Sequence, residues 1–230
     1  MARSASRLRV VVVGGSLGGL LAGIMLEWIG CDVTVHERVA EPLAERGAGI
    51  ATHPELHEAF ERVGIPIDDG FGVRIEERLM LGRDGQVLAT FHKRQILATW
   101  GHLYRVLHRA FPREHYVAGS AFVRAEPSGA GVHAHFADGS MTDADLLVSA
   151  DGIRSTVRAQ FWPHCLPRYA GYVAWRGVAE EVRLSPETHR TLFVRFVVRQ
   201  PPREHMVGCP VAALDRDLTP GSRRSNFVWL

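Results

Sequence analysis

The sequence has few cysteines and no block of basic residues, and both absences narrow the class of protein. Its three cysteines, Cys31, Cys165 and Cys209, are odd in number and widely spaced. This pattern argues against a disulfide framework or a metal cluster and fits reduced cytosolic thiols. Arginines are scattered and the net charge is only +2, so the charge pattern does not indicate a nucleic-acid partner. We therefore expect a cytoplasmic protein that binds no nucleic acid.

The sequence also lacks an apolar run long enough to cross a membrane. The charge-free run Val10–Leu26 has 17 residues, five of them glycine, whereas a spanning helix needs roughly 20 predominantly apolar residues. The basic start, MARSASRLR, leads to no small-residue cleavage site. We expect no membrane segment, and we explain the run as a buried strand followed by a buried helix.

The first 37 residues have the pattern of a βαβ unit. Residues 10–13 form a continuous β-branched run, typical of a strand that is covered on both faces of a parallel sheet. The pattern predicts a helix over 17–29, ending at Gly30, and a second strand over 32–37. The crossover is long enough for the two strands to pair in parallel.

The rest of the chain of 230 residues alternates between strand and helix patterns, which predicts an α/β fold. Asp84-Gly85 and Asp138-Gly139 are typical hairpin turns. Helices are expected over 55–63, 100–111 and 154–160. Pairs of strands are expected over 73–91 and 121–136, and single strands over 145–150, 172–178, 192–198, 205–211 and 227–230. Prolines cluster near 162–168, so we expect one domain over 1–165 and a second, β-rich domain over 166–230. The apolar end, NFVWL, indicates either a strand tied into a sheet or a fragment.

The glycine-rich stretch VVVGGSLGGL permits two interpretations. Gly14–Gly18 spells G-x-S-x-G, the elbow of a serine hydrolase, but only fifteen residues precede Ser16, too few for the strand that supplies an oxyanion hole. Read to Gly19, the stretch is one substitution from the dinucleotide fingerprint G-x-G-x-x-G. That fingerprint requires an acidic residue after the next strand, and Glu37 stands 23 residues after Gly14. We favour a dinucleotide site, the alternative being a βαβ unit whose glycine turn binds nothing.

In that interpretation the turn and the helix start hold a pyrophosphate. Gly14 permits the tight turn, and Gly19 lets the helix pack closely on the strand. Free backbone N–H groups and the helix dipole attract the phosphates. Ser16 replaces the usual middle glycine, and its hydroxyl is able to donate to a phosphate oxygen. The candidate phosphate-binding residues are Gly14, Gly15, Ser16, Leu17, Gly18 and Gly19.

Three motifs in this order resemble a known family. They are the opening unit with Glu37-Arg38, GAGI at Gly47–Ile50, and DLLVSADGIRSTVR at Asp145–Arg158. Together they resemble the single-component FAD-dependent aromatic hydroxylases of the p-hydroxybenzoate and salicylate hydroxylase type. GGSLGGL with YAGYVAWRGV resembles the branch that contains 2,6-dihydroxypyridine 3-monooxygenase. The resemblance covers essentially the whole chain.

The resemblance implies a Rossmann-like FAD-binding domain and the start of a β-rich substrate domain. It places Gly14, Ser16 and Gly19 at the FAD pyrophosphate, Glu37 at the adenosine ribose and Arg38 near the adenine. It places Gly49 and Ile50 beside the flavin, and Asp151-Gly152 in a motif for FAD and NAD(P)H. Arg154, Ser155 and Arg158 share that motif, although a capped, solvated helix start explains them equally well.

The resemblance also implies the chemistry. NADH or NADPH reduces FAD, O2 reacts to give a flavin hydroperoxide, and one oxygen atom is transferred to a small, electron-rich aromatic or N-heteroaromatic ring. The cofactor performs the redox steps, so we name no catalytic residue and expect no metal. The partners are this aromatic substrate and O2, with no membrane, and a homodimer is compatible with the sequence.

Two departures from the family pattern favour an alternative. Trp100 stands where the family often has an arginine that reaches the flavin. The family's second FAD motif, a Gly-Asp pair, is missing, since Asp215 and Asp217 lack its setting, and the family's chains are longer. The alternative is a truncated, non-catalytic remnant of such an enzyme that binds flavin or nucleotide.

His53 and His57 with Glu55 do not predict a zinc-binding helix. His53 precedes a proline, and a residue in that position disfavours the helical conformation.

Overall fold

The computed structural model describes residues 7–43, 49–214 and 216–230. The chain divides into two compact units. The first lies within Met1–Glu45 and Leu103–Arg168, and the second within Arg46–His102 and Tyr169–Leu230. Each unit is therefore built from two separate stretches of sequence.

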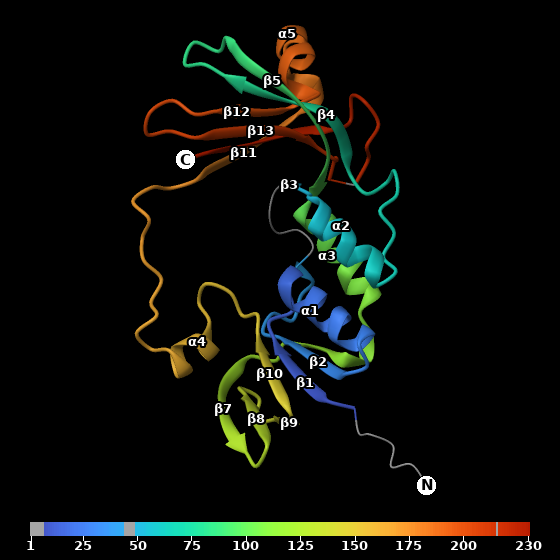
Figure 1. Cartoon of the computed structure of the whole chain (residues 1–230), viewed down its shortest axis with the longest axis vertical. Coiled ribbons are helices and arrows are strands. Elements are labelled where there is room, and N and C mark those ends of the chain that lie inside the picture. Colours follow the sequence, from blue (N-terminus) through green and yellow to red (C-terminus); the bar gives the residue numbers. More distant parts are fainter. Residues whose placement is uncertain (1–6, 44–48, 215) are drawn as a thin grey trace. The chain divides into compact units, whose positions relative to one another are not determined.

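The first unit contains a parallel sheet of four strands (Figure 1). In spatial order these are β10 (Leu146–Ser149), β1 (Arg9–Val13), β2 (Asp32–Glu37) and β6 (Tyr116–Ala118). Every neighbouring pair is parallel. The valines of β1 are at most 4% exposed, as expected for a central strand covered on both faces. All four carboxyl ends therefore lie at one edge of the sheet.

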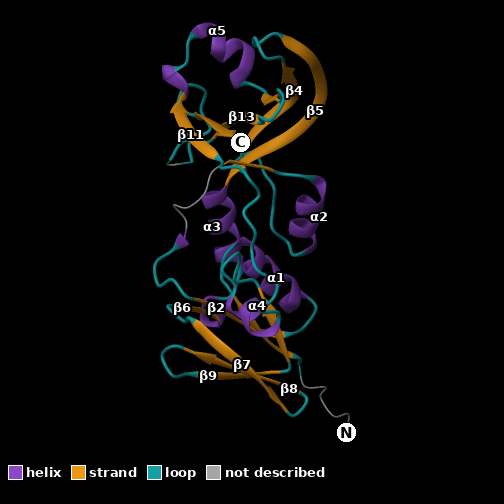
Figure 2. Cartoon of the chain, turned by 90° about the vertical axis from the view of Figure 1, so that its left-hand side faces the viewer, coloured by secondary structure: helices purple, strands orange, loops and turns teal. Residues whose placement is uncertain are grey.

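Helices and a second, smaller sheet complete the first unit. Helix α1 (Leu17–Trp28) passes close to β2, since a methyl group at Gly23 would lie 3.1 Å from Val35 Cγ2. Among the described residues, the other helical segments are the 3-10 helix η2 (Arg113–His115), α4 (Thr156–Phe161) and α3 (Trp100–Ala110), whose first three residues belong to the second unit. Figure 2 shows the antiparallel sheet of β7 (Phe122–Ser128), β8 (Gly131–Phe136) and β9 (Met141–Ala144).

The second unit contains a seven-stranded mixed sheet. Its spatial order is β11 (Trp175–Glu180), β14 (Arg224–Trp229), β13 (Met206–Val211), β12 (Phe196–Arg199), β4 (Val73–Leu81), β5 (Val87–Thr99) and β3 (Gly49–Ala51). Only β12 and β4 pair in parallel among these described strands. The C-terminal strand β14 lies between β11 and β13, so the apolar end of the chain is tied into a sheet.

Short helices connect the strands of the second unit. Helix α2 (Pro54–Arg62) begins with proline at its first position. After β11 come the 3-10 helix η3 (Glu181–Arg183), the short helix α5 (Pro186–Thr188) and the π-helix η4 (His189–Phe193). The strand predicted over 192–198 is therefore wrong at its start. The Oγ atom of Ser185 accepts a hydrogen bond from the backbone N–H of Thr188 (3.1 Å) and begins this helical stretch.

The compact units differ from the domain ranges expected from the sequence. Residues 46–102 join the C-terminal segment because β4 pairs with β12 along four residues. The boundary between Arg168 and Tyr169 follows the stretch where prolines cluster.

The three cysteines are free. Within the described ranges, no helix combines the length and the apolar character needed to cross a membrane.

Candidate functional site

The sheet of the first unit brings the two separate sequence motifs to one edge. The chain leaves β1 at Gly14, whose N–H donates to the carbonyl of His36 (2.8 Å), and leaves β10 at Ala150, whose N–H donates to the carbonyl of Val13 (2.8 Å). The connection from β1 leads to β2 on one side, while β10 lies on the other side. Such a reversal of strand order is where open α/β sheets bind ligands.

Close backbone contacts require glycine at two positions of the turn. Gly14 has a φ of +106°, and a side chain there would overlap the carbonyl of Ala150. A side chain at Gly19 would overlap the carbonyl oxygen of Gly14. Both glycines therefore allow α1 to start directly against the strands, as the fingerprint predicts.

The start of α1 presents backbone donors beside an open space. Ser16 is the N-cap residue and makes no capping bond with its side chain. The first helical bond runs from Leu20 N to Ser16 O (2.9 Å), so the N–H groups of Leu17, Gly18 and Gly19 precede the intrahelical pattern. A methyl group at Gly18 would meet no atom within 4 Å. Sterically, this position does not require glycine.

That open space is part of a cavity of about 560 Å³. Both predicted motifs line it, the glycine turn through Gly18 and the second motif through the segment after β10. The complete lining is Gly18, Ala22, Val148, Ser149, Ala150, Asp151, Gly152, Ser155 and Arg158. Of the helix-start donors, Gly18 lines this cavity. A backbone donor at a helix start with room beside it is what the phosphates of a dinucleotide need, so the residues present fit such a group.

Glu37 contacts the glycine turn, and only 7% of its surface is exposed. Its Oε2 atom accepts a hydrogen bond from Gly15 N (2.8 Å), and its Oε1 atom accepts one from Val39 N (2.9 Å). An ionised carboxylate can accept about four hydrogen bonds, so Glu37 retains capacity for the hydroxyl groups of a ribose. The neighbouring Arg38 is exposed.

Asp151 uses its carboxylate to cap α4. Oδ2 accepts from Thr156 N (2.7 Å) and Val157 N (3.2 Å), and Oδ1 accepts from Ser149 Oγ (2.7 Å). Burial raises the pKa of Asp151, but the hydrogen bonds from serine side chains and Val157 N outweigh it and hold the pKa below its usual value. Ser155 also caps this helix, Arg158 bonds the carbonyls of Gly152 and Ile153, and Arg154 is exposed. The capped helix start is thus an observed role of this motif.

The remaining predicted residues lie in the second unit. Gly49 and Ile50 form part of β3 and pair with Thr99 and Ala98. Gly47 and Ala48 of the GAGI motif, like Asp215, lie outside the described residues. A methyl group at Gly49 would lie 2.7 Å from Val211 Cγ1, so strand packing explains this glycine. A cavity of about 730 Å³ is lined by Gly49, Ile50, Trp100, Arg176, Gly177, Val178 and Asn226.

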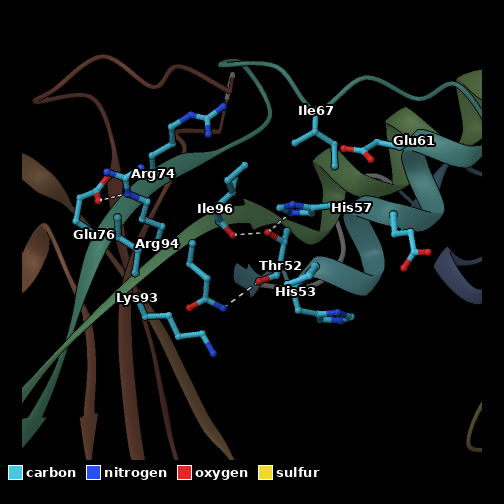
Figure 3. Close-up of a pocket in the computed structure, with 14 residues that line it drawn as sticks. Thr52, His53, His57, Glu61, Ile67, Arg74, Glu76, Lys93, Arg94 and Ile96 are labelled. Atoms are coloured by element: carbon cyan, nitrogen blue, oxygen red, sulfur yellow. Dashed lines mark hydrogen bonds and ion pairs between the residues drawn. The ribbon is translucent and has the colours of Figure 1, made fainter.

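A further cavity of the second unit, of about 890 Å³, lies beside α2 (Figure 3). Thr52 Oγ1 donates to Ile96 O (2.9 Å), so it accepts from His57 Nε2 (2.8 Å). Gln95 Nε2 donates to Thr52 O (2.9 Å). His53 and His57 both line this cavity. The sequence did not predict this, because His53 precedes a proline and was not expected to share a helix face with His57. In the part of the chain that the structure describes, no group of potential ligands is arranged to hold a metal.

The sequence patterns did not predict the roles of two residues of the first unit, Tyr116 and His36. Tyr116 donates its hydroxyl hydrogen to the carbonyl of Gly15 (3.2 Å). His36 is 5% exposed, bonds Ser120 Oγ through Nδ1 (2.8 Å) and stacks on Phe136. Burial lowers the pKa of His36 to about 4. Neither residue belongs to a motif, and the adjacency of β2 and β6 that brings Tyr116 to the turn leaves no local signal in the sequence.

The chain is similar to flavin-dependent proteins in sequence. A family model described as "FAD binding domain-like" matches residues 169–230, which lie in the second unit. The 2,6-dihydroxypyridine 3-monooxygenase of Paenarthrobacter nicotinovorans is 30% identical over 225 residues, or 96% of this chain and 55% of that protein. The FAD-dependent urate hydroxylase of Klebsiella pneumoniae is 31% identical over 204 residues, or 81% of this chain and 52% of that protein.

A solved structure shares the fold. The 2,6-dihydroxypyridine-3-hydroxylase of Arthrobacter nicotinovorans matches with a TM-score of 0.87 and 29% identity, over 98% of this chain and 56% of that chain. The predicted α/β fold of the p-hydroxybenzoate hydroxylase type is therefore confirmed. The chain spans about half the length of the curated relatives it matches.

Proposed function

Because the chain belongs to the family of FAD-dependent aromatic hydroxylases, we propose that its first unit binds the pyrophosphate and adenosine ribose of FAD. We further propose that the protein uses this FAD, with NADH or NADPH, to hydroxylate a small, electron-rich aromatic or N-heteroaromatic compound. FAD, when bound, supplies the exchange of electrons with the nicotinamide and with O2. The chain's own residues bind, orient and exclude water.

One observation carries the proposal for FAD. The cavity in the first unit is lined by Gly18 of the glycine-rich stretch and by the Asp151-Gly152 segment, which are more than 130 residues apart in sequence. The helix start supplies N–H donors and the positive end of its dipole to the pyrophosphate. Glu37 would accept the ribose hydroxyls with the lone pairs that Gly15 and Val39 leave free.

A second cavity supports the proposal for the substrate. Arg176 and Trp100 line the cavity of the second unit together with Gly49 and Ile50. A guanidinium group binds an anionic oxygen and also stacks on an aromatic face. Arg176 would therefore orient a ring that carries an ionised hydroxyl or carboxylate. This assignment favours acidic phenols and hydroxypyridines over neutral hydrocarbons.

FAD binding is the first experiment. The purified chain is incubated with FAD, free cofactor is removed, and retained flavin is measured by absorbance. We expect the wild-type chain to retain FAD and Gly18→Leu to lose most of it. A Cβ atom at position 18 would meet no atom within 4 Å, so the leucine side chain would start in the open space of the cavity that Gly18 lines. Helix propensity favours leucine over glycine by roughly 0.8 kcal/mol.

Gly18→Ala is the matched control, because it has the same gain in helix propensity and a side chain too short to fill the cavity. It should retain FAD. If Gly18→Leu folds and binds FAD as tightly as the wild-type chain does, the proposed position of the cofactor is wrong. A folded wild-type chain that retains no flavin contradicts the proposed function itself.

Oxidation of NADH and NADPH is then followed with a panel of phenols and hydroxypyridines, and the products are analysed for one added oxygen atom. A hydroxylated product supports the enzyme assignment. Retained FAD with no ring hydroxylation across the panel would instead support flavin binding without catalysis.

A further inference from the structure

The peptide groups on both sides of Gly15 are fixed by two residues from different strands. Gly15 N–H donates to Oε2 of Glu37 (2.8 Å), which ends β2. The carbonyl of Gly15 accepts a hydrogen bond from the hydroxyl of Tyr116 (3.2 Å), which begins β6. Gly15 is itself buried. The turn therefore has two side-chain supports, of which only Glu37 belongs to the dinucleotide fingerprint.

The hydroxyl of Tyr116 is committed as a donor to the turn. It has one proton, which goes to Gly15 O, so the contact with Tyr104 (3.4 Å) has Tyr104 as the donor. The ring of His108 packs against the ring of Tyr116 with centroids 4.7 Å apart at 73°. Burial raises the pKa of Tyr116 above its usual value, which keeps the proton on this oxygen at neutral pH.

The glycine at position 15 is complementary to this tyrosine. A methyl group there would overlap the hydroxyl oxygen of Tyr116 and lie 2.7 Å from its Cε2 atom and 2.8 Å from Cβ of Glu37. At Gly18, three residues later, a methyl group would meet nothing. The space beside Gly15 is therefore filled by the protein, whereas the space beside Gly18 is open.

We propose that Tyr116 is a positioning residue of the phosphate-binding turn. Its hydroxyl and the carboxylate of Glu37 hold the backbone on both sides of Gly15, so that the helix-start N–H groups are ordered before the cofactor arrives. Ordering a binding loop in advance lowers the entropy cost of binding. The inference rests on the proposed function for its effect on FAD, but the ordering of the turn is a property of the chain alone.

The first arm of the test uses the cofactor-free chain. Tyr116→Phe removes the hydroxyl and keeps the ring. Loss of a hydrogen bond of ordinary strength corresponds to about a 3- to 10-fold change, and we expect amide hydrogen exchange at Gly15 and Ser16 to accelerate by about that factor. Tyr104→Phe is the matched control, since it also removes one tyrosine hydroxyl, the one that bonds the hydroxyl of Tyr116 (3.4 Å), and it should change this exchange less than about 2-fold.

The second arm measures FAD. We expect Tyr116→Phe to weaken FAD binding by about 3- to 10-fold and to shift the 31P resonances of the bound pyrophosphate, while the denaturation midpoint stays close to that of Tyr104→Phe. A merely structural role would lower the midpoint of Tyr116→Phe and leave the 31P resonances unchanged.

The outcomes separate the two proposals. Unchanged exchange at Gly15 in Tyr116→Phe, or equal acceleration in both variants, overturns the positioning role whatever FAD does. If exchange accelerates in Tyr116→Phe but the wild-type chain binds no FAD, the result supports the ordering of the turn by Tyr116 and contradicts the proposed function. Accelerated exchange with unchanged FAD affinity and unchanged 31P resonances overturns the role of Tyr116 in cofactor binding.

Discussion

The guanidinium group of Arg223 forms two hydrogen bonds with the carboxylate of Glu181, from Nε to Oε2 (3.0 Å) and from Nη2 to Oε1 (2.9 Å). Glu181 is 4% exposed and also accepts hydrogen bonds from Gly221 N, Arg223 N and His189 Nε2. Burial raises the pKa of Glu181, but these bonds, led by that from Arg223, outweigh it and lower the pKa to about 2. The pair ties the loop before β14 to η3.

Removal of this charge should destabilise the second unit strongly. We expect Glu181→Gln to lower the free energy of unfolding by about 3 kcal/mol, because it leaves the partly buried Arg223 without its counterion. The measurement is urea denaturation at pH 7. The matched control is Glu180→Gln, which removes an exposed pair with Arg183 (3.0 Å) and should cost less than about 1 kcal/mol. Equal losses in the two variants would contradict a special role for the buried pair.

Stability should fall in acid because of His36. Its pKa in the folded chain, about 4, lies below the ordinary value of 6.5, so below pH 6.5 the unfolded chain takes up the proton first. Stability is therefore lost as the pH falls from 6.5 to 4. The difference corresponds to about 3 kcal/mol when it is fully expressed.

NMR titration of the His36 ring and urea denaturation as a function of pH check this. His36→Asn keeps a polar side chain near Ser120 but does not titrate, so the stability difference between this variant and the wild-type chain should change over the same pH window. A His36 ring that titrates near 6.5 in the folded chain would refute the prediction.

The cap of α4 gives a third prediction. Asp151→Ala removes the acceptor for Thr156 N and Val157 N and should cost about 1–2 kcal/mol locally. Amide exchange at Thr156 and Val157 should accelerate accordingly. Asp151→Asn keeps an acceptor oxygen and should cost less than about 1 kcal/mol. The cap assignment is wrong if Asp151→Ala leaves exchange along α4 unchanged.

Thiol labelling should distinguish the cysteines. Cys165 is exposed, whereas Cys31 and Cys209 are buried, and burial raises the pKa of the Cys209 thiol. Since the thiolate is the reactive form, we expect one rapidly labelled thiol in the folded chain and three in denaturant. Cys165→Ser should abolish the rapid phase. Rapid labelling of two thiols in that variant would show that the buried cysteines become accessible.

Local patterns predicted the elements that build the candidate site. The helix expected over 17–29 runs over Leu17–Trp28, and the strand expected over 32–37 has those bounds. These succeed because glycine positions, β-branched runs and apolar spacing act on the residues that carry them. A local signal for α5 was present as well, since Ser185-Pro186 is a typical helix start, but the apolar stretch beside it was interpreted as a strand.

Contacts between distant segments could not be predicted in this way. The pairing of Val35 with Tyr116 and of Phe196 with Arg78 depends on the packing of whole sheets. The Arg78 guanidinium group lies over the Phe196 ring (4.7 Å to its centroid), but no local pattern in either strand identifies its partner. The support of the turn by Tyr116, the burial of His36 and the grouping of residues 46–102 with the C-terminal segment all follow from such pairings.

The interleaved order of the two units has a consequence for synthesis. Strands β1 and β2 leave the ribosome early, but β10, which pairs with Val10–Val13 of β1, follows more than 130 residues later. During that interval one edge of the central strand has no native neighbour, and such edges are prone to aggregation. Chaperone contacts with this edge of β1 in nascent chains should therefore persist until residue 149 has emerged and should fall once β10 has docked.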